Sequence, residues 1–494
     1  MSDMKSNVRV RPWTGVSLAL LLAGTMGIGG CDFLDPTNVE NPQTTLDDLA
    51  EAGEPTAAIL SGMRAQFARM VNTASVVQEV VSDNYSIHGT GLSGTWDFPR
   101  EITPGDANST GDATGVYWNA QELKAQGNFV LDVVAPDDST ATVDQVAETH
   151  YYRGMAYLYL AENFAYAPIE EDGAALPADQ LLDLAVADFD AALAGDLFDV
   201  HAQAALARAY RWLGDAGSAG AAAQAALAED PEFAILQEYD AVSITNSANA
   251  FLVLRALQEM QPLPRLDFLD PKFLTRESGI PVHKAEEMHL ILAEIELAAG
   301  NLGPAQGHMV DAIAVAEGRP GIAFVDDDPR LNADLSIRPR SANFLVRADA
   351  NSPYVPGLVL DRPGPTTQAT ISGTSLTEAD ILALNTLDEG WRTFHLLRQE
   401  LLFLEGRRMS DLGIRLPVMQ VELDQNPTVS PDDPAAQVVV PAYIPHLNQM
   451  DLYTPLALYE ETGEGGVVQL ETEVTMTVDM NRILADNRVT PFGS

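Results

Sequence analysis

Residues 201–231 hold the sequence feature that most limits what this chain can fold into. The segment reads HAQAALARAYRWLGDAGSAGAAAQAALAEDP, with small alanines at helical spacing on both sides of Gly214-Asp215 and Pro231 after the second half. Alanine lets two antiparallel helices approach closely, Gly-Asp forms the turn between them, and proline ends a helix. The segment therefore predicts a helical hairpin that cannot bury its own apolar face and needs stacked neighbours.

The same spacing recurs at residues 285–317, and in both copies it is that of a tetratricopeptide repeat. The matching residues are Leu206, Ala207, Tyr210, Gly214, Asp215, Ala219, Ala226 and Pro231 in the first copy, and Leu292, Ala293, Gly300, Asn301, Ala305 and Ala312 in the second. Residues 151–193 fit a third copy with its turn expanded into 166–178, and 379–412 fit a fourth helix pair. We therefore predict a mainly α fold, a tetratricopeptide-type helical-repeat scaffold with long loop-rich insertions.

Several segments outside the repeats also have a clear pattern. Helical spacing predicts further helices over 54–82, 143–165 and 178–194. Irregular stretches at 232–284 and 318–376 are long enough to be functional or packed by their own side chains. Near the C-terminus, the alternating segment 467–477 predicts minor β structure, as a short strand pair or an edge strand.

The first thirty residues have the pattern of a secretory signal. Three cations precede a short apolar stretch over 16–28: Lys5, Arg9 and Arg11. The stretch is shorter than the roughly 20 apolar residues that span a bilayer. Ile28-Gly29-Gly30-Cys31 then resembles the lipobox of bacterial lipoproteins. We predict a lipoprotein signal peptide over 1–30, lipidation of Cys31 and a polar tether over 31–53.

Cys31 is the only cysteine, so no intramolecular disulfide can form. The alternative to lipidation is a soluble secreted protein in which this cysteine occurs by chance. A membrane contact through the lipid anchor is the interpretation that gives the lone thiol a role.

Charge and motifs exclude several classes of function. The net charge is −43 and the pI is near 4.2, which argues against nucleic acid, because its phosphates need basic partners. The acidity fits either a saline habitat, where salt screens self-repulsion, or solubility alone. No nucleophile elbow, zinc-protease, P-loop or dinucleotide-binding motif is present, and the eight histidines are scattered without metal-ligand spacing. We predict no enzyme activity.

Four segments resemble the SusD/RagB family: CDFLDP at 31–36, ETHYYRGMAYLYLAENFAYAPI at 148–169, PVHKAEEMHLILAEIELAAGNLGPA at 281–305, and LLRQELLFLEGRRMSDLGIRLP at 396–417. The last is the most specific, through Arg398, Glu400, Leu401, Glu405, Gly406, Arg408, Asp411 and Leu412. Considered without the family, Glu405, Arg408 and Asp411 lie three residues apart and can pair with one another as a structural network.

The resemblance implies a SusD-like N-terminal region over 54–240 and a RagB/SusD-like C-terminal region over 241–494. It also implies a surface-exposed lipoprotein of the outer membrane. Such a protein captures oligosaccharides, or peptides, for a SusC-like TonB-dependent transporter and catalyses nothing. The alternative is a helical-repeat lipoprotein that scaffolds outer-membrane protein assembly or other protein–protein interaction.

An insertion at 83–118 supplies the candidate ligand-binding residues: Trp96, Trp118, Tyr117, Tyr85, Asn84, Asp97 and Arg100. Flat aromatic faces suit the apolar side of a sugar ring, and the polar groups suit its hydroxyls. Tyr354, in a later loop, is a second choice. The alternative is that these rings fill a small core of the insertion itself.

The same insertion contains a partial calcium loop. The candidate ligands are Asp106, Asn108, Thr110 and Asp112. Tyr117 stands at the twelfth position, where such loops have a bidentate glutamate. The alternative is an ordinary polar turn, and no other cofactor is predicted.

Overall fold

The computed structural model describes residues 53–87, 94–106, 115–195, 198–253, 260–325, 343–361, 365–446, 450–455, 459–461, 467–469 and 471–493. The predicted signal peptide, Cys31 and all of the tether up to residue 52 lie outside the described residues. Residues Gly53–Ser494 form one compact unit.

The fold is mainly α, as the repeats predict. The α-helices are α2 (Pro55–Val80), α3 (Val116–Phe129), α4 (Val143–Asn163), α5 (Ala178–Ala192), α6 (Asp199–Leu213), α7 (Ala216–Glu229), α8 (Ala285–Ala298), α9 (Leu302–Gly318), α10 (Glu378–Leu382), α11 (Leu387–Leu401), α12 (Arg408–Asp411), α13 (Gln420–Gln425) and α14 (Met480–Asp486). Shorter 3-10 and π segments are η2 (Gly94–Asp97), η3 (Pro99–Glu101), η4 (Val130–Val134), η5 (Asn249–Val253), η6 (Pro264–Lys272) and η7 (Pro434–Ala436).

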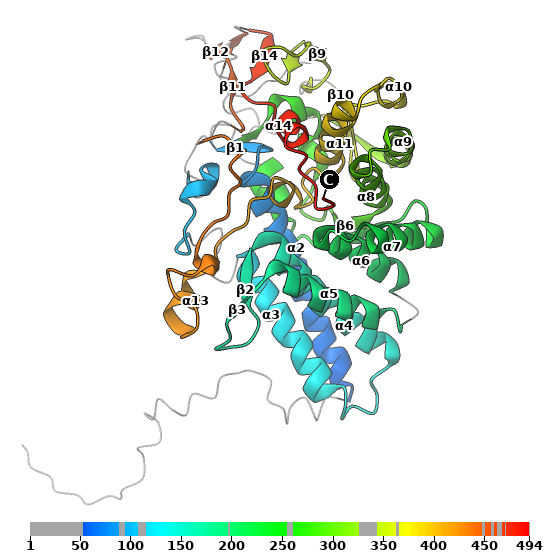
Figure 1. Ribbon diagram of the computed structural model, residues 1–494, viewed down its shortest axis with the longest axis vertical. Helices are drawn as coiled ribbons and strands as arrows, with labels where there is room; N and C mark the ends of the chain where they lie inside the picture. The colour runs from blue at the N-terminus through cyan, green and yellow to red at the C-terminus, as the bar shows by residue number, and fades with distance from the viewer. Residues whose placement is uncertain are drawn as a thin grey trace, which may run out of the picture. The chain divides into compact units, whose positions relative to one another are not determined.

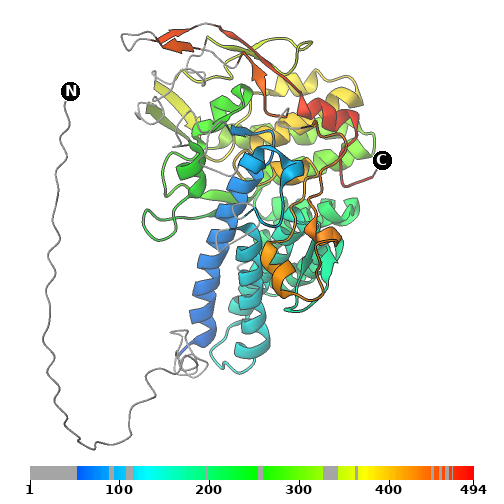
Figure 2. The same ribbon diagram turned by 90° about the vertical axis from the view of Figure 1, so that its left-hand side faces the viewer.

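Three helix pairs form the predicted repeats and pack in chain order. The pairs are α4–α5, α6–α7 and α8–α9, and each packs on the next through α5 with α6 and α7 with α8 (Figure 1). At the other end, α2 and α3 run side by side and pack against α4 (Figure 2). Stacking buries the apolar faces that a single pair would leave exposed.

The turns between repeat helices form as the sequence predicts. Gly214 ends α6 with φ +74°, and the Asp215 carboxylate caps α7 by accepting a hydrogen bond from the Ser218 N–H at 3.0 Å. Gly300 has φ +80° at the corresponding turn before α9. Glycine adopts this left-handed conformation without the penalty that a side chain would cause. The third copy also forms, with a small β-hairpin in its expanded turn.

The predicted fourth helix pair within 379–412 does not form. Only α11 in that segment is a long helix, because α10 has five residues and α12 has four. α11 packs instead on α8, α9 and α14, which comes from the end of the chain.

Short strands occupy the regions between the helices. They are β1 (Tyr85–Ile87), β2 (Tyr166–Pro168), β3 (Ala175–Pro177), β4 (Ala234–Gln237), β5 (Met260–Pro262), β6 (Ile280–Lys284), β7 (Gly321–Val325), β8 (Leu345–Arg347), β9 (Val355–Pro356), β10 (Pro365–Ala369), β11 (Tyr453–Thr454), β12 (Tyr459–Glu461), β13 (Val467–Gln469) and β14 (Glu473–Met476). The predicted strands near the C-terminus are present. β13 pairs with β12, and β14 lies inside a four-stranded sheet of order β11-β14-β8-β9.

Buried ion pairs connect the segment 396–417 to the rest of the core. The prediction that Glu405, Arg408 and Asp411 pair with one another is wrong, because Glu405 lies in the turn between α11 and α12. Arg408 pairs with Asp83 of the turn after α2, at 2.5 and 2.8 Å. The other two pair with residues of different elements: Glu405 with Lys272 and Lys284, and Asp411 with Arg398 and Arg211.

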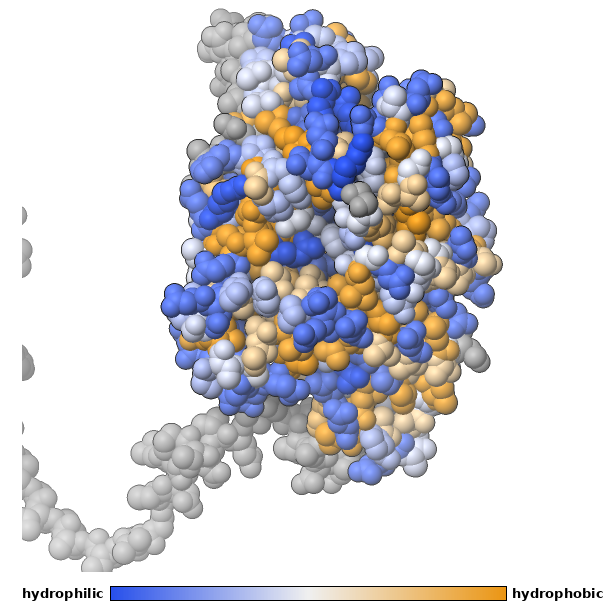
Figure 3. Space-filling view, in the orientation of Figure 1, coloured by the Kyte–Doolittle hydropathy of each residue, from blue (hydrophilic) through white to orange (hydrophobic). Residues whose placement is uncertain are grey.

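The face of the molecule shown in Figure 3 has a mixed hydropathy. Hydrophobic and hydrophilic residues are interspersed over most of it, and hydrophilic residues gather over α14 and the segment after it. Among the described residues, no helix combines the length and apolar character that crossing a membrane requires.

Candidate functional site

A pocket of about 360 Å³ lies where β8, the loop after it, α11 and the start of α14 meet. Its apolar wall includes Val346, Leu358, Leu376 and Leu396, and its charged residues include Arg265, Arg347, Asp380, Arg392, Glu400 and Asp479. The volume falls at the lower end of the range of small-molecule pockets, roughly 300–1,000 Å³. Apolar walls with a few converging polar groups are the usual composition of such sites.

Arg347 lines this pocket and lies against Tyr354, which stands in the chain between the lining residues Pro353 and Val355. The Arg347 guanidinium lies over the Tyr354 ring, 4.6 Å from its centroid. It also donates from Nε to Thr475 Oγ1 at 2.8 Å and from Nη1 to the Ala350 carbonyl at 3.0 Å. The cation and its hydrogen bonds therefore fix the half-buried ring against the sheet.

Two further arginines hold the elements around the pocket in place. Arg392 of α11 pairs with the buried Asp479 carboxylate at 2.8 Å and donates to Ser352 Oγ at 3.2 Å. Arg482 of α14 pairs with Asp349 at 3.2 Å. Burial opposes the ionised form of Asp349, but the Asn351 N–H and Arg482 outweigh it and lower the pKa of this carboxyl. The Arg392–Ser352 hydrogen bond and the Arg482–Asp349 pair attach the loop after β8 to helices.

The floor is a buried polar layer. Glu400 accepts hydrogen bonds from Thr374 Oγ1, Ser375 Oγ and the Ser375 N–H at 2.7–2.8 Å. Burial nevertheless raises the pKa of Glu400. Asn481 accepts from Arg408 at 3.0 Å and donates to Gln399 at 2.8 Å, which links the pocket floor to the core. These partners fix the floor before any ligand arrives.

The structure corrects the sequence-predicted aromatic binding face. The Tyr85, Trp96 and Tyr117 rings are buried, so they present no flat face to solvent. Tyr85 stacks on Phe403 and donates to Asp270 at 3.0 Å, and Tyr117 donates to Glu422 at 3.0 Å. The alternative interpretation, that these rings fill a core, describes all three.

The polar candidates around them are held by protein partners. Asn84 is buried between Glu79 and Gln399. Asp97 is buried beside Asp451, and burial and this second carboxyl raise the pKa of Asp451 well above its usual value.

Arg100 and Trp118 complete the predicted set. Arg100 is half-buried and donates to the Pro441 and Ile444 carbonyls at 3.0 and 2.9 Å. Trp118 lies in the first turn of α3, not in a loop, and it is 41% exposed. It alone of the four predicted aromatic residues offers an open face.

Only Asp106 of the predicted calcium ligands lies within the described residues, and Asn108, Thr110 and Asp112 lie outside them. The Asp106 carboxylate accepts a hydrogen bond from the Thr103 N–H at 2.8 Å. A turn of this kind forms without an ion, and calcium binding stays a prediction.

Sequence reasoning missed most of the pocket. Arg265, Arg347, Arg392 and Asp479 belong to segments far apart in the chain and share no motif. The one available signal was the length of the irregular stretch 318–376, which includes β8 and Tyr354. The second-choice residue Tyr354 is therefore the sequence-predicted aromatic nearest to the pocket.

Comparison with known proteins gives a clear result for the fold. No family model and no curated protein matches the sequence. Among solved structures, a SusD superfamily protein from Bacteroides fragilis aligns with a TM-score of 0.50 at 14% identity, over 76% of this chain and 98% of that one. NanU from B. fragilis aligns with a TM-score of 0.50 at 11% identity, over 79% and 98%. The alignments cover nearly the whole length of both solved structures, and this chain shares their fold.

Proposed function

We propose that this chain is a lipid-anchored binding protein of the outer-membrane surface. It captures oligosaccharides, or peptides, and delivers them to a SusC-like TonB-dependent transporter. The observation that supports capture best is the pocket on the SusD-like scaffold, which Arg347 and Arg392 line and where the Tyr354 ring lies against Arg347. The lipobox-like segment ending in Cys31 supports the anchor.

A saccharide suits the chemistry of this pocket. One face of a sugar ring is made of C–H groups and packs on aliphatic or aromatic surface, while its hydroxyls both donate and accept hydrogen bonds. The pocket offers Leu396 and Leu358 beside guanidinium donors and carboxylate acceptors. A peptide with polar side chains would use the same groups, so the test includes both ligand classes.

The first experiment is a binding screen of the purified protein against glycan and peptide arrays, followed by calorimetry on the best ligand. Tyr354→Ala removes the ring that holds the pocket residue Arg347, and it is expected to weaken binding about tenfold or more, a loss of about 1.4 kcal/mol. Trp118→Ala is the matched control, since this aromatic residue is exposed but does not line the pocket.

The outcomes separate the alternatives. Loss of binding only in Trp118→Ala would move the site to the sequence-predicted face while leaving capture intact. Absence of any glycan or peptide ligand would overturn capture and favour the scaffold alternative, for which the stacked repeats alone suffice.

The anchor and the transporter need their own test. Cys31→Ser is expected to move the protein from the membrane fraction to the soluble fraction, with loss of incorporated labelled fatty acid. Affinity capture of the anchored protein from detergent extracts is expected to recover a TonB-dependent transporter. Recovery of Cys31→Ser in the membrane fraction at the wild-type level would contradict the lipid anchor.

A further inference from the structure

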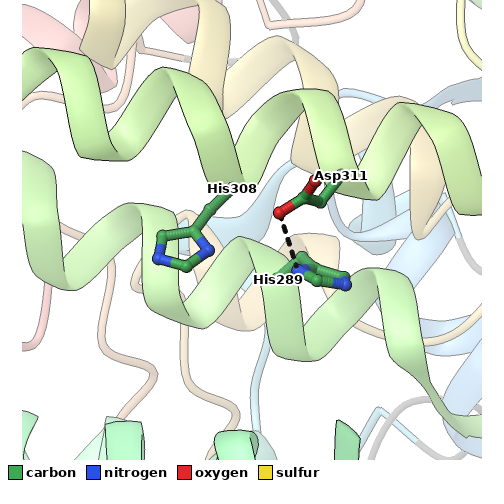
Figure 4. Close-up of side chains that lie close together, drawn as sticks. All are labelled: His289, His308 and Asp311. Atoms are coloured by element: carbon green, nitrogen blue, oxygen red, sulfur yellow. Dashed lines mark ion pairs between the residues drawn. The ribbon is translucent and has the colours of Figure 1, made fainter. Parts of the chain in front are cut away.

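Two histidines and an aspartate meet between the helices of the α8–α9 repeat (Figure 4). His289 comes from α8, while His308 and Asp311 come from α9. One potential ligand atom from each of the three side chains lies within 4.8 Å of the others. None of these residues belongs to the pocket described above.

The helix pair fixes this arrangement. His308 and Asp311 are three residues apart, so they share one face of α9. Ala305 and Ala312 of α9 are buried, which lets α9 pack closely on α8. The His289 Nδ1 lies 3.9 Å from an Asp311 carboxylate oxygen, and the two imidazole centroids are 6.3 Å apart.

The imidazoles have unused nitrogen atoms. Nδ1 of His289 and Nδ1 of His308 are sheltered from solvent, and neither has a hydrogen-bond partner within the part of the chain that the structure describes. A neutral imidazole has a lone pair free for a metal.

We propose that His289, His308 and Asp311 bind one divalent transition-metal ion of the Zn²⁺ class between α8 and α9. Two imidazole nitrogens and one carboxylate oxygen are ligands that Zn²⁺ prefers, whereas Ca²⁺ and Mg²⁺ prefer oxygen alone. Metal–ligand bonds of about 2.0–2.2 Å place tetrahedral ligand atoms roughly 3.3 Å apart. The Asp311 side chain is 59% exposed and can rotate to close the remaining distance.

Three protein ligands leave a fourth position for water or for a group of another molecule. The ion would also join the two helices of one repeat, which raises the stability of the folded state as metal concentration rises. This site stands independently of the proposed capture function.

The test is calorimetric titration of the tag-free protein with ZnCl₂, together with the absorption spectrum of its Co²⁺ complex. The wild type is expected to bind one ion, give the intense visible bands of tetrahedral Co²⁺, and melt at a higher temperature with Zn²⁺. His308→Ala and Asp311→Asn are each expected to weaken binding about tenfold or more.

Two variants serve as matched controls. His446→Ala removes an exposed imidazole elsewhere, and Glu317→Gln removes an exposed carboxylate on α9, so both are expected to bind as the wild type does. Circular dichroism checks that every variant is folded. Absence of saturable one-to-one binding in the wild type, or its persistence in the His289→Ala/His308→Ala double variant, would overturn the proposal.

Discussion

Charged residues are buried throughout the core, and their partners decide whether they stabilise it. Arg408 and Asp83 are nearly inaccessible and join the turn after α2 to the segment 396–417. A buried pair gains little over apolar packing, but removal of one partner leaves an uncompensated charge in the interior. The contact between Arg408 and Asp83 thus gives Arg408 of this segment a structural role.

Substitution of Arg408 tests this interpretation. Arg408→Met is expected to lower the free energy of unfolding by about 3 kcal/mol, because Asp83 keeps its burial and loses the closer of its two arginine partners, with Arg265 left at 3.5 Å. Arg488→Met is the control: its partner Asp388 is exposed, so the expected loss is below about 1 kcal/mol. Urea denaturation of both variants gives the comparison, and equal losses would contradict the argument.

Glu79 predicts a pH dependence. Burial raises the pKa of Glu79 to about 7, against the hydrogen bonds that favour its ionised form. The folded state therefore holds this proton more tightly than the unfolded chain does, and stability falls as pH rises from about 4.5 through 7. Each unit of pKa corresponds to about 1.4 kcal/mol, so the loss is about 3 kcal/mol.

The variant Glu79→Gln isolates this contribution. Between pH 5 and pH 8, the free energy of unfolding of the wild type is expected to fall more steeply than that of the variant. Denaturant titrations at both pH values measure the difference. Parallel pH profiles would show that Glu79 titrates normally in the folded protein.

The repeat turns use glycine in two different settings, which allows a matched comparison. Both Gly214 and Gly300 have positive φ, but a Cβ at Gly214 would lie 2.7 Å from the Pro491 carbonyl oxygen, while a Cβ at Gly300 meets no atom within 4 Å. Gly300→Ala is expected to cost roughly 1–2 kcal/mol of backbone strain. Gly214→Ala adds a clash and is expected to cost about 2–4 kcal/mol.

Thermal melts of the two variants decide whether the C-terminal segment supports the repeat. A larger loss for Gly214→Ala is expected. Equal losses would show that the segment around Pro491 moves away from the added Cβ without loss of stability.

The sequence predicts the repeat helices because their determinants are local. Alanine spacing, Gly214-Asp215 and a following proline all lie within about thirty residues. The pocket has no such local signal. Its residues, such as Arg265, Arg347 and Asn481, lie far apart in the sequence and come together only in the folded protein. The prediction that the aromatic rings of 83–118 bind a ligand failed for a related reason. The sequence of Tyr85 and Tyr117 fits a sugar-binding face and a hydrophobic core equally well, and only their burial in the structure distinguishes these two roles. His289 and His308 likewise meet only across two helices.

Across the whole molecule, one electrostatic property follows from composition alone. The chain has 71 acidic and 28 basic residues. Many of the arginines and lysines are used in buried pairs, such as Arg407 with Glu287 and Lys284 with Glu405. The surface is therefore left with a large excess of carboxylates that repel one another.

Salt is expected to stabilise the protein through this repulsion. Raising ionic strength from 0.01 M to 0.15 M shortens the Debye length from about 30 Å to about 8 Å, which screens surface charges but not buried pairs. We expect the Tm at pH 7 to rise by at least about 2 °C over this range. At pH 4.5, close to the pI of 4.2, the net charge is small and the rise should nearly vanish. An unchanged or falling Tm at pH 7 would mean that the acidic residues are already neutralised pairwise within the fold.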